Sequence, residues 1–300
     1  MRAWLYLMPL VVFAQDRPVF RADATLVTVP VLVTDARGTP VRDLEQSDFR
    51  VYDNDLPCQI RQLWFEEQLP LAIGIVVDIS DSQRSFLREH RAVVDAFVAR
   101  MLRGGDRAFI VAVNQKVNLE AEFIGKPSGV SQVLLPAGGQ GLGVQCGTLG
   151  GRGLCGGTAL WNAVYATAHE KLSRYEGSRA LLILSDGNDT GSTHSLDQAL
   201  AEVQRAGAIV YAIRYPDPIS HISGEDLARL AAETGGVEFT APSSDYDAIA
   251  DFGRIERDLR SHYVLGISPS AAPDPIHRLR VEVTRPGLTV RARREYVAPQ

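Results

Sequence analysis

The chain has 300 residues, of which 45% are hydrophobic and 22% are charged. This composition is that of a globular protein with one large domain or two smaller ones. The formal net charge of -5 gives the surface no general attraction for nucleic acid or for acidic lipid. We therefore expect no nucleic acid among its partners.

The amino-terminal segment has the features of a secretory signal, which is removed from the mature protein. Arg2 supplies the positive charge, residues 3–13 are apolar, and Ala14 ends a small-residue cleavage motif. The apolar stretch is too short to span a bilayer, and no later stretch is long and apolar enough. We expect a signal peptide over residues 1–14, no membrane-spanning segment after its removal, and a secreted, periplasmic or cell-envelope location. A buried amino-terminal strand or helix is the alternative.

The three cysteines would then lie in an oxidising compartment, where cysteines close in sequence form disulfides. Cys146 and Cys155 are the predicted pair, and their bond would stabilise the fold by about 2–3 kcal/mol in the entropy model. Cys58 would be left over, either buried as a small apolar residue or available for an intermolecular bond.

Both ends of the chain alternate apolar with polar residues, which is the period-two pattern of strands with one buried face. The alternating residues are Val27, Val29, Val31 and Val33 near one end, and Leu279, Val281 and Val283 near the other. We expect β segments over residues 20–66 and 262–297. They are predicted to form one small β domain around an inserted domain, and two separate β appendages are the alternative.

The middle of the chain, over residues 69–261, alternates continuous apolar runs with amphipathic helices. The apolar runs are 71–77, 108–113, 180–184 and 208–213, and the predicted helices are 86–102, 159–172, 196–205, 225–233 and 246–260. Continuous apolar strands separated by helices are typical of a parallel sheet with helices on both faces. The sequence thus predicts an α/β fold with a doubly wound, mostly parallel sheet.

Oxygen-bearing side chains follow two of these apolar runs directly. Asp78, Ser80 and Ser82 begin where the first run ends, and Asp186 follows the third. The carboxyl ends of parallel strands meet at one edge of the sheet, where open α/β folds place their ligand crevice. Thr158 is expected at the cap of a helix on the same rim. Such hard oxygen ligands suit Mg²⁺ or Mn²⁺.

This set resembles the metal-ion-dependent adhesion site of von Willebrand factor A domains, in which an Asp-x-Ser-x-Ser loop is followed by a Thr and an Asp. The resemblance implies that Ser80 and Ser82 bind the metal directly and that Thr158 does so directly or through water. It implies that Asp78 and Asp186 act through water. An open coordination position would accept an Asp or Glu carboxylate of a protein partner.

Further motifs resemble the flanks of an acidobacterial group of secreted, A-domain-related proteins. They are Val-Thr-Asp at 33–35, Asp-Phe-Arg-Val-Tyr at 48–52 and Tyr-Val-Leu-Gly at 263–266. The chain departs from the commoner A-domain pattern at Ile79 and Asp81, where small residues are frequent, and in a long Gly/Cys loop before the Thr. Asp81 is expected either to strengthen cation binding or to face solvent.

These observations predict a metal-dependent binding or adhesion module that is not an enzyme. A metal-dependent hydrolase is the alternative, because two aspartates and a divalent ion can activate water. A structural envelope scaffold with an unused metal site is the third possibility. In the simplest alternative the two aspartates only cap loops and the threonine only caps a helix. A histidine or a second metal beside the site would favour catalysis.

Overall fold

The computed structural model describes residues 26–67, 69–124, 157–216, 224–241, 248–271 and 274–298. The expected signal segment, Cys146 and Cys155 lie outside these residues, so the signal peptide and the disulfide stay predictions. No helix within the described ranges is long and apolar enough to cross a membrane.

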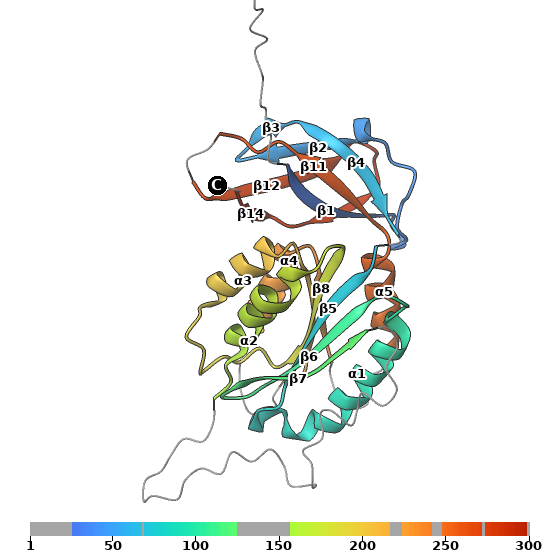
Figure 1. Ribbon diagram of the computed structural model, residues 1–300. Coiled ribbons are helices and arrows are strands. Elements are labelled where there is room, and N and C mark those ends of the chain that lie inside the picture. Colours follow the sequence, from blue (N-terminus) through green and yellow to red (C-terminus); the bar gives the residue numbers. More distant parts are fainter. Residues whose placement is uncertain are drawn as a thin grey trace, which may run out of the picture.

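The middle of the chain forms a six-stranded sheet with the strand order β10-β9-β8-β5-β6-β7 (Figure 1). Its strands are β5 (Leu71–Asp78), β6 (Arg107–Val113), β7 (Val117–Ile124), β8 (Ser178–Ser185), β9 (Ile209–Arg214) and β10 (Val237–Thr240). Every neighbouring pair is parallel except β6 and β7, which are antiparallel. All eight residues of β5 are buried, because helices cover both faces of the sheet.

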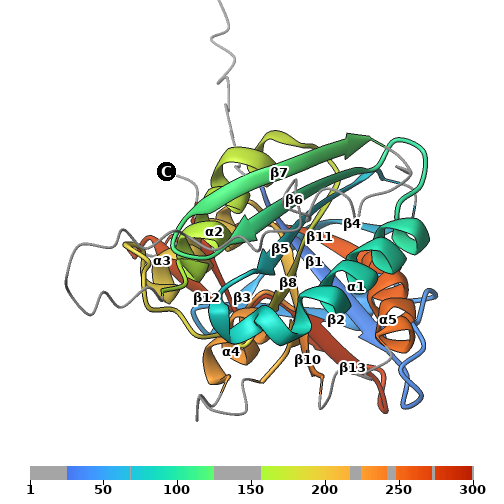
Figure 2. The same ribbon diagram turned by 90° about the horizontal axis from the view of Figure 1, so that it is seen from below.

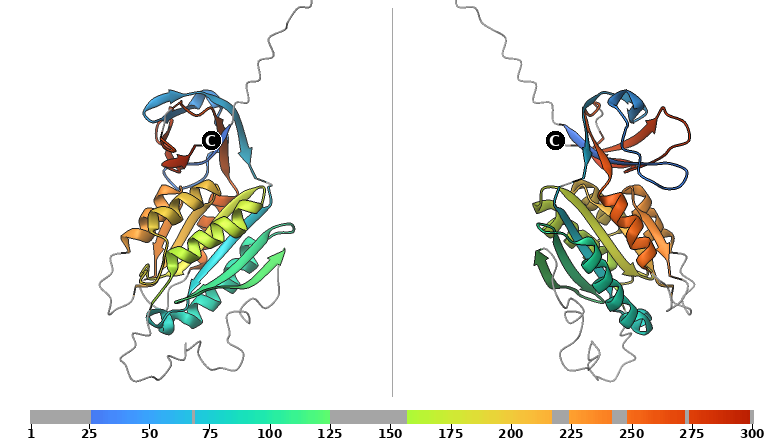
Figure 3. Two further views of the ribbon diagram at one scale, coloured as in Figure 1. Left: turned by 60° about the vertical axis from the view of Figure 1, so that its left-hand side comes forward. Right: turned by 90° about the vertical axis from the view of Figure 1, so that its right-hand side faces the viewer.

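Helices pack on both faces of this sheet, which confirms the predicted doubly wound architecture (Figure 3). On one face lie α1 (Leu87–Met101) and α5 (Ile249–Leu259). On the other lie α2 (Leu160–Ala166), α3 (Leu196–Arg205) and α4 (Glu225–Glu233). Alternate residues of β5 face the two helix layers, with Ile73 and Ile75 toward α1 and α5 and Val76 toward α2.

Two strands of the sheet have no counterpart in the sequence prediction. The edge strand β7 alternates apolar and polar residues and exposes Leu119, so it lacks the continuous apolar run of a buried strand. The opposite edge strand, β10, is only four residues long. The predicted helix 86–102 is preceded by a 3-10 turn at Asp81–Phe86, and the predicted helix 159–172 ends in a π turn at Thr167–Lys171.

Strands from both chain ends form one β domain with two four-stranded sheets, so the alternative of two separate appendages is wrong. The first sheet has the order β13 (Thr289–Ala292), β1 (Val27–Thr34), β11 (His262–Ile267), β4 (Ile60–Glu66). The second has the order β14 (Glu295–Val297), β12 (Ile276–Val283), β2 (Phe49–Asp53), β3 (Leu56–Cys58). Their shared core includes Val29, Phe49, Tyr263 and Leu265. Each sheet therefore needs both ends of the chain.

Cys58 lies half-buried against the core of the β domain. Its Sγ atom donates a hydrogen bond to the carbonyl oxygen of Ser268 at 2.9 Å. Burial raises the pKa of the Cys58 thiol, and the negative charge of Asp53 raises it further. The thiol form is thereby favoured over the reactive thiolate.

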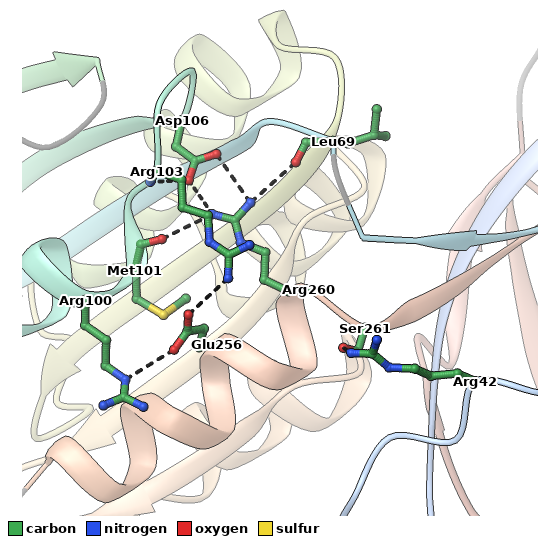
Figure 4. Close-up of polar contacts among 9 residues, drawn as sticks. All are labelled: Arg42, Leu69, Arg100, Met101, Arg103, Asp106, Glu256, Arg260 and Ser261. Carbon is green, nitrogen blue, oxygen red and sulfur yellow. Dashed lines mark hydrogen bonds and ion pairs between the residues drawn. The ribbon is translucent and has the colours of Figure 1, made fainter.

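The chain passes between the domains at the amino-terminal end of the parallel strands, where a buried ion pair lies (Figure 4). The Asp106 carboxylate pairs with Arg260, at the end of α5. It also accepts hydrogen bonds from the backbone N–H groups of Leu71 and Arg103, at 2.8 and 2.7 Å. This cluster ties the start of β5 to the end of α5, next to both crossings of the chain.

Gly177 precedes β8 at this same end and has a φ of +105°, which side chains rarely allow. A Cβ atom there would also lie too close to the carbonyl oxygen of Pro70. We expect Gly177→Ala to lower the free energy of unfolding by about 1–3 kcal/mol, measured by urea denaturation. Gly104→Ala is the matched control, because no atom of the described residues lies within 4 Å of its added Cβ. Equal stability of the two variants would contradict this prediction.

Candidate functional site

Four of the five predicted site residues lie together at the carboxyl end of the parallel sheet, opposite the β domain. Asp78 is the last residue of β5, and Asp186 follows the last residue of β8. Because β5 and β8 are paired neighbours, the two carboxylates come to one edge of the sheet, as predicted. Ser80 and Ser82 follow in the loop and 3-10 turn after β5. Figure 2 views the molecule from this end.

Hydrogen bonds connect these side chains into one network. The backbone N–H of Ser80 donates to Oδ1 of Asp78 at 2.9 Å. The hydroxyl oxygens of Ser80 and Ser82 lie 3.1 Å apart, and the Ser82 hydroxyl donates to Oδ2 of Asp186 at 2.7 Å. The Ser185 hydroxyl donates to Oδ2 of Asp78 at 2.6 Å. Both carboxylates are thereby held in fixed orientations toward the two serines.

The network carries buried negative charge. Asp78 is fully buried and Asp186 is only 2% exposed. No ion pair joins either carboxylate to a basic side chain in the described part of the chain, and Arg84 of the same loop pairs with Asp81 instead. Burial raises the pKa of Asp78 to about 6, and the charge of Asp186 contributes, although hydrogen bonds from Ser185 and Ser80 oppose the shift. A cation at this edge would compensate the two carboxylates.

Most of the side chains that could bind a cation at this edge are hydroxyls. Within the described ranges, no three His, Cys, Asp or Glu side chains converge as a metal cluster. A cation here would therefore depend on neutral serine and threonine oxygens, with two carboxylates behind them. That donor set fits a hard divalent ion such as Mg²⁺ or Mn²⁺ rather than zinc, which favours histidine and cysteine.

Thr158 lies on the adjoining loop, 5% exposed, but the prediction that it caps the following helix is wrong. The cap residue of α2 is Ala159, which makes no side-chain cap bond. The loop after β8 caps this helix instead. Asp189 accepts from the backbone N–H of Trp161 at 3.2 Å, and Ser192 accepts from that of Asn162 at 3.0 Å. The Thr158 hydroxyl is therefore not used in capping.

The backbone of Thr158 is fixed against the loop that carries Asp186. Its N–H donates to the Thr190 hydroxyl at 3.1 Å, and its carbonyl accepts from the N–H groups of Thr190 and Gly191 at 3.0 Å each. No hydrogen bond between described residues joins the Thr158 hydroxyl to the two serines or to Asp186. The structure thus brings Thr158 to the same rim without linking its side chain to the network.

Four supporting residues had no assigned role in the sequence prediction: Ser185, Asp189, Thr190 and Ser192. Ser185 orients Asp78, while Asp189 and Ser192 cap α2 and Thr190 holds Thr158. The only sequence signal was the density of short polar side chains after β8. Short polar side chains commonly bond to nearby backbone, so this signal does not specify which group they hold.

Asp81 faces solvent, which decides between the two expectations for this residue. Its side chain is 73% exposed and forms a 3.6 Å ion pair with Arg84, three residues on. An exposed pair of this kind contributes little to stability. Asp81 lies in the site loop but outside the hydrogen-bonded network, so it is a suitable control position.

One histidine, His90 of α1, lies beneath the site. Burial lowers its pKa to about 4, although it lies beside the backbone carbonyl of Asp78. Its ring packs edge-on against Tyr215 at 4.5 Å and is stacked 6.5 Å from Phe86. The imidazole is therefore neutral near pH 7 and belongs to the apolar layer under the sheet edge.

No protein-family model matches this chain, and the search of curated proteins gave no match. Solved structures with a similar arrangement include proximal thread matrix protein 1 from the mussel byssus, with 14% identity and a TM-score of 0.49. That match covers 74% of this chain, which spans only about half of the mussel protein, 51%.

Two further structures, one bacterial and one archaeal, match a larger share of this chain. A von Willebrand factor type A protein from Catenulispora acidiphila has 10% identity and a TM-score of 0.47, over 93% of this chain and 75% of that one. The ArnB paralog VWA2 from Sulfolobus acidocaldarius has 12% identity and a TM-score of 0.44, over 91% and 77%. The resemblance to an acidobacterial group stays a prediction.

Proposed function

We propose that this protein is a binding module of the von Willebrand factor A type, which holds a partner protein through a divalent cation, Mg²⁺ or Mn²⁺. The observation that carries the proposal is the buried network at the carboxyl edge of the sheet. It contains two carboxylates, two connected serine hydroxyls and no basic partner among the described residues. We also propose a secreted, periplasmic or cell-envelope location.

Each residue of the network has a role in this proposal. The hydroxyls of Ser80, Ser82 and Thr158 would hold the ion. Both oxygens of Asp78 already accept hydrogen bonds, from the Ser80 backbone and from Ser185, which suits an orienting role behind the ligands. Asp186 orients Ser82 in the same way. Neutral hydroxyl ligands would leave part of the charge of a bound ion uncompensated. An Asp or Glu carboxylate of the partner would then bind the ion at an open coordination position.

Metal titration tests the site directly. We expect the parent protein to bind one Mn²⁺ in calorimetry and Ser82→Ala to bind it about 10–100-fold more weakly, because the change removes a ligand and the hydrogen bond to Asp186. Asp81→Asn should keep the parent affinity, because Asp81 is exposed outside the network. Circular dichroism would verify the fold of each variant. Equal affinity in all three proteins would refute the site.

Partner capture tests the adhesion role. Immobilised protein should retain a partner with Mg²⁺ present and release it on chelation, whereas Ser82→Ala should retain little. A partner held equally well after chelation would show that no cation lies in the interface, and a scaffold role would then be the better account. Turnover of a substrate that needs the same metal would favour the hydrolase alternative.

A further inference from the structure

A cavity of about 480 Å³ lies between the two domains, at the amino-terminal end of the parallel strands and so opposite the cation network. Its walls come from β1 and the end of β14 in the β domain, and from the start of β8 and the α3–β9 turn in the α/β domain. Three arginines line it, Arg179, Arg205 and Arg293, and no acidic residue is among its described lining. The cavity is therefore strongly basic in a protein of negative net charge.

Two of these guanidinium groups converge on one wall. Arg293 donates to the carbonyl oxygens of Gln204 at 3.1 Å and Thr28 at 2.6 Å. Arg179 donates to the carbonyl oxygen of Ala206 at 2.7 Å. Because the carbonyls of Gln204 and Ala206 are two residues apart at the end of α3, both guanidinium groups lie at the same helix end. The third, Arg205, is already paired with Glu202.

Arg293 differs from the other buried arginine of the described residues, Arg260, in its charged neighbours. Both are 9% exposed. Arg260 is paired with Asp106, whereas no ion pair to an acidic side chain is found for Arg293 or Arg179 in the described ranges. Among the described residues the Nε atoms of both arginines are buried without an acceptor, and the guanidinium carbon of Arg293 lies 5.5 Å from the centre of the Tyr296 ring. A buried cation without a counter-charge is unfavourable.

Burial lowers the pKa of Arg293 to about 10 and also lowers that of Arg179, for which the charge of Glu176 offsets burial only in part. Capping of α3 explains part of the arrangement, because positive side chains bind the last carbonyls of helices. The helix end, however, provides only about half a negative charge. Two full positive charges at one helix end therefore leave an excess of positive charge that the helix end does not compensate.

We propose that this cavity binds a small organic anion, with a carboxylate or phosphate group between Arg179 and Arg293. Guanidinium groups bind both kinds of oxyanion through paired, charge-assisted hydrogen bonds. The remaining walls include the apolar side chains of Leu26, Val27 and Val297, which suit a short apolar body on the same ligand. The site is independent of the cation network, because it lies at the other end of the parallel strands.

Thermal unfolding and calorimetry of the full chain test this proposal with two probes, octanoate and inorganic phosphate, against sodium chloride at equal ionic strength. At least one probe should raise the unfolding temperature beyond chloride. Arg179→Gln should bind that probe at least about tenfold more weakly, because a charge-assisted hydrogen bond is lost. Arg179 is chosen because it is only partly buried, so its loss should leave the fold intact.

Arg229→Gln is the matched control, because Arg229 is an exposed arginine of α4 paired with Asp197 and Glu233 outside the cavity. It should bind the probes like the parent. Binding of octanoate alone would identify a carboxylate ligand, and binding of phosphate alone a phosphate ligand. The proposal would be overturned if both probes acted only as chloride does, or if neither had any effect. It would also be overturned if Arg179→Gln bound the probe as tightly as the parent.

Discussion

Asp106→Ala is expected to lower the free energy of unfolding by about 3–5 kcal/mol, measured by urea denaturation. Asp106 is buried and pairs with buried Arg260 (Figure 4). Its carboxylate also accepts from the backbone N–H groups of Leu71 and Arg103. The alanine leaves a buried guanidinium without its counter-charge and two buried donors without an acceptor, and both losses destabilise the folded state.

A double replacement separates these two contributions. Asp106→Leu combined with Arg260→Met removes both charges, so we expect it to be more stable than Asp106→Ala alone. Asp197→Ala, which breaks an exposed pair with Arg229, should change stability by less than about 1 kcal/mol. If the double variant is as unstable as the single one, the lost backbone hydrogen bonds rather than the unpaired charge account for the effect.

Asp53→Ala is expected to lower the free energy of unfolding by about 3 kcal/mol, because Asp53 is the shared acceptor of a buried cluster in the β domain. It accepts from the Ser270 backbone N–H at 2.6 Å, the Tyr296 hydroxyl at 2.9 Å and Nδ1 of His277 at 2.9 Å. The alanine would remove the acceptor that these three groups share. Tyr296→Phe removes only one of the bonds and should destabilise by about 1 kcal/mol.

The contribution of Asp53 should also depend on pH. Burial alone would raise its pKa, but hydrogen bonds from Ser270, His277 and Tyr296 outweigh burial and hold the pKa below its ordinary value of 3.8. The folded state thus favours the carboxylate, so this stabilisation is complete above about pH 4 and is lost as the pH falls through the folded pKa.

We would measure the stability difference between parent and Asp53→Ala by denaturation at several pH values from neutral to about pH 3. The difference should shrink in the most acidic samples. Asp55→Asn is the control, because Asp55 is exposed, pairs with Arg278 and has a positive φ that asparagine tolerates. A difference that stays constant over this range would show that Asp53 acts without its charge.

Much of the α/β domain could be predicted from local patterns. The helices α3 and α4 begin and end at the predicted residues, because capping and apolar spacing lie within the helix itself. In α3, for example, Ser195 and Gln198 form a capping box. The edge strand β7 escaped prediction because its pattern depends on having only one neighbour in the sheet.

Part of the candidate site could also be predicted from the sequence, and part could not. The position of Asp78 and Asp186 after buried strands follows from the sequence, because strand ends are encoded by where the apolar runs stop. The roles of Thr190 and Asp189 do not follow from it. They hold Thr158 and cap α2 from a loop about 30 residues away, and short polar side chains bond to whichever backbone the fold brings near.

By itself the sequence determined the helices and the four buried strands of the α/β domain, their buried faces and the loop that carries Asp78, because each depends on residues close along the chain. Only the tertiary structure decided the pairing of charges across long separations. Asp106 meets Arg260 over 154 residues, and Asp53 meets His277 over 224. Among the described residues, the fold places no acidic partner beside Arg293. A buried charge is stabilised by what the fold places beside it, and no local pattern encodes that neighbour.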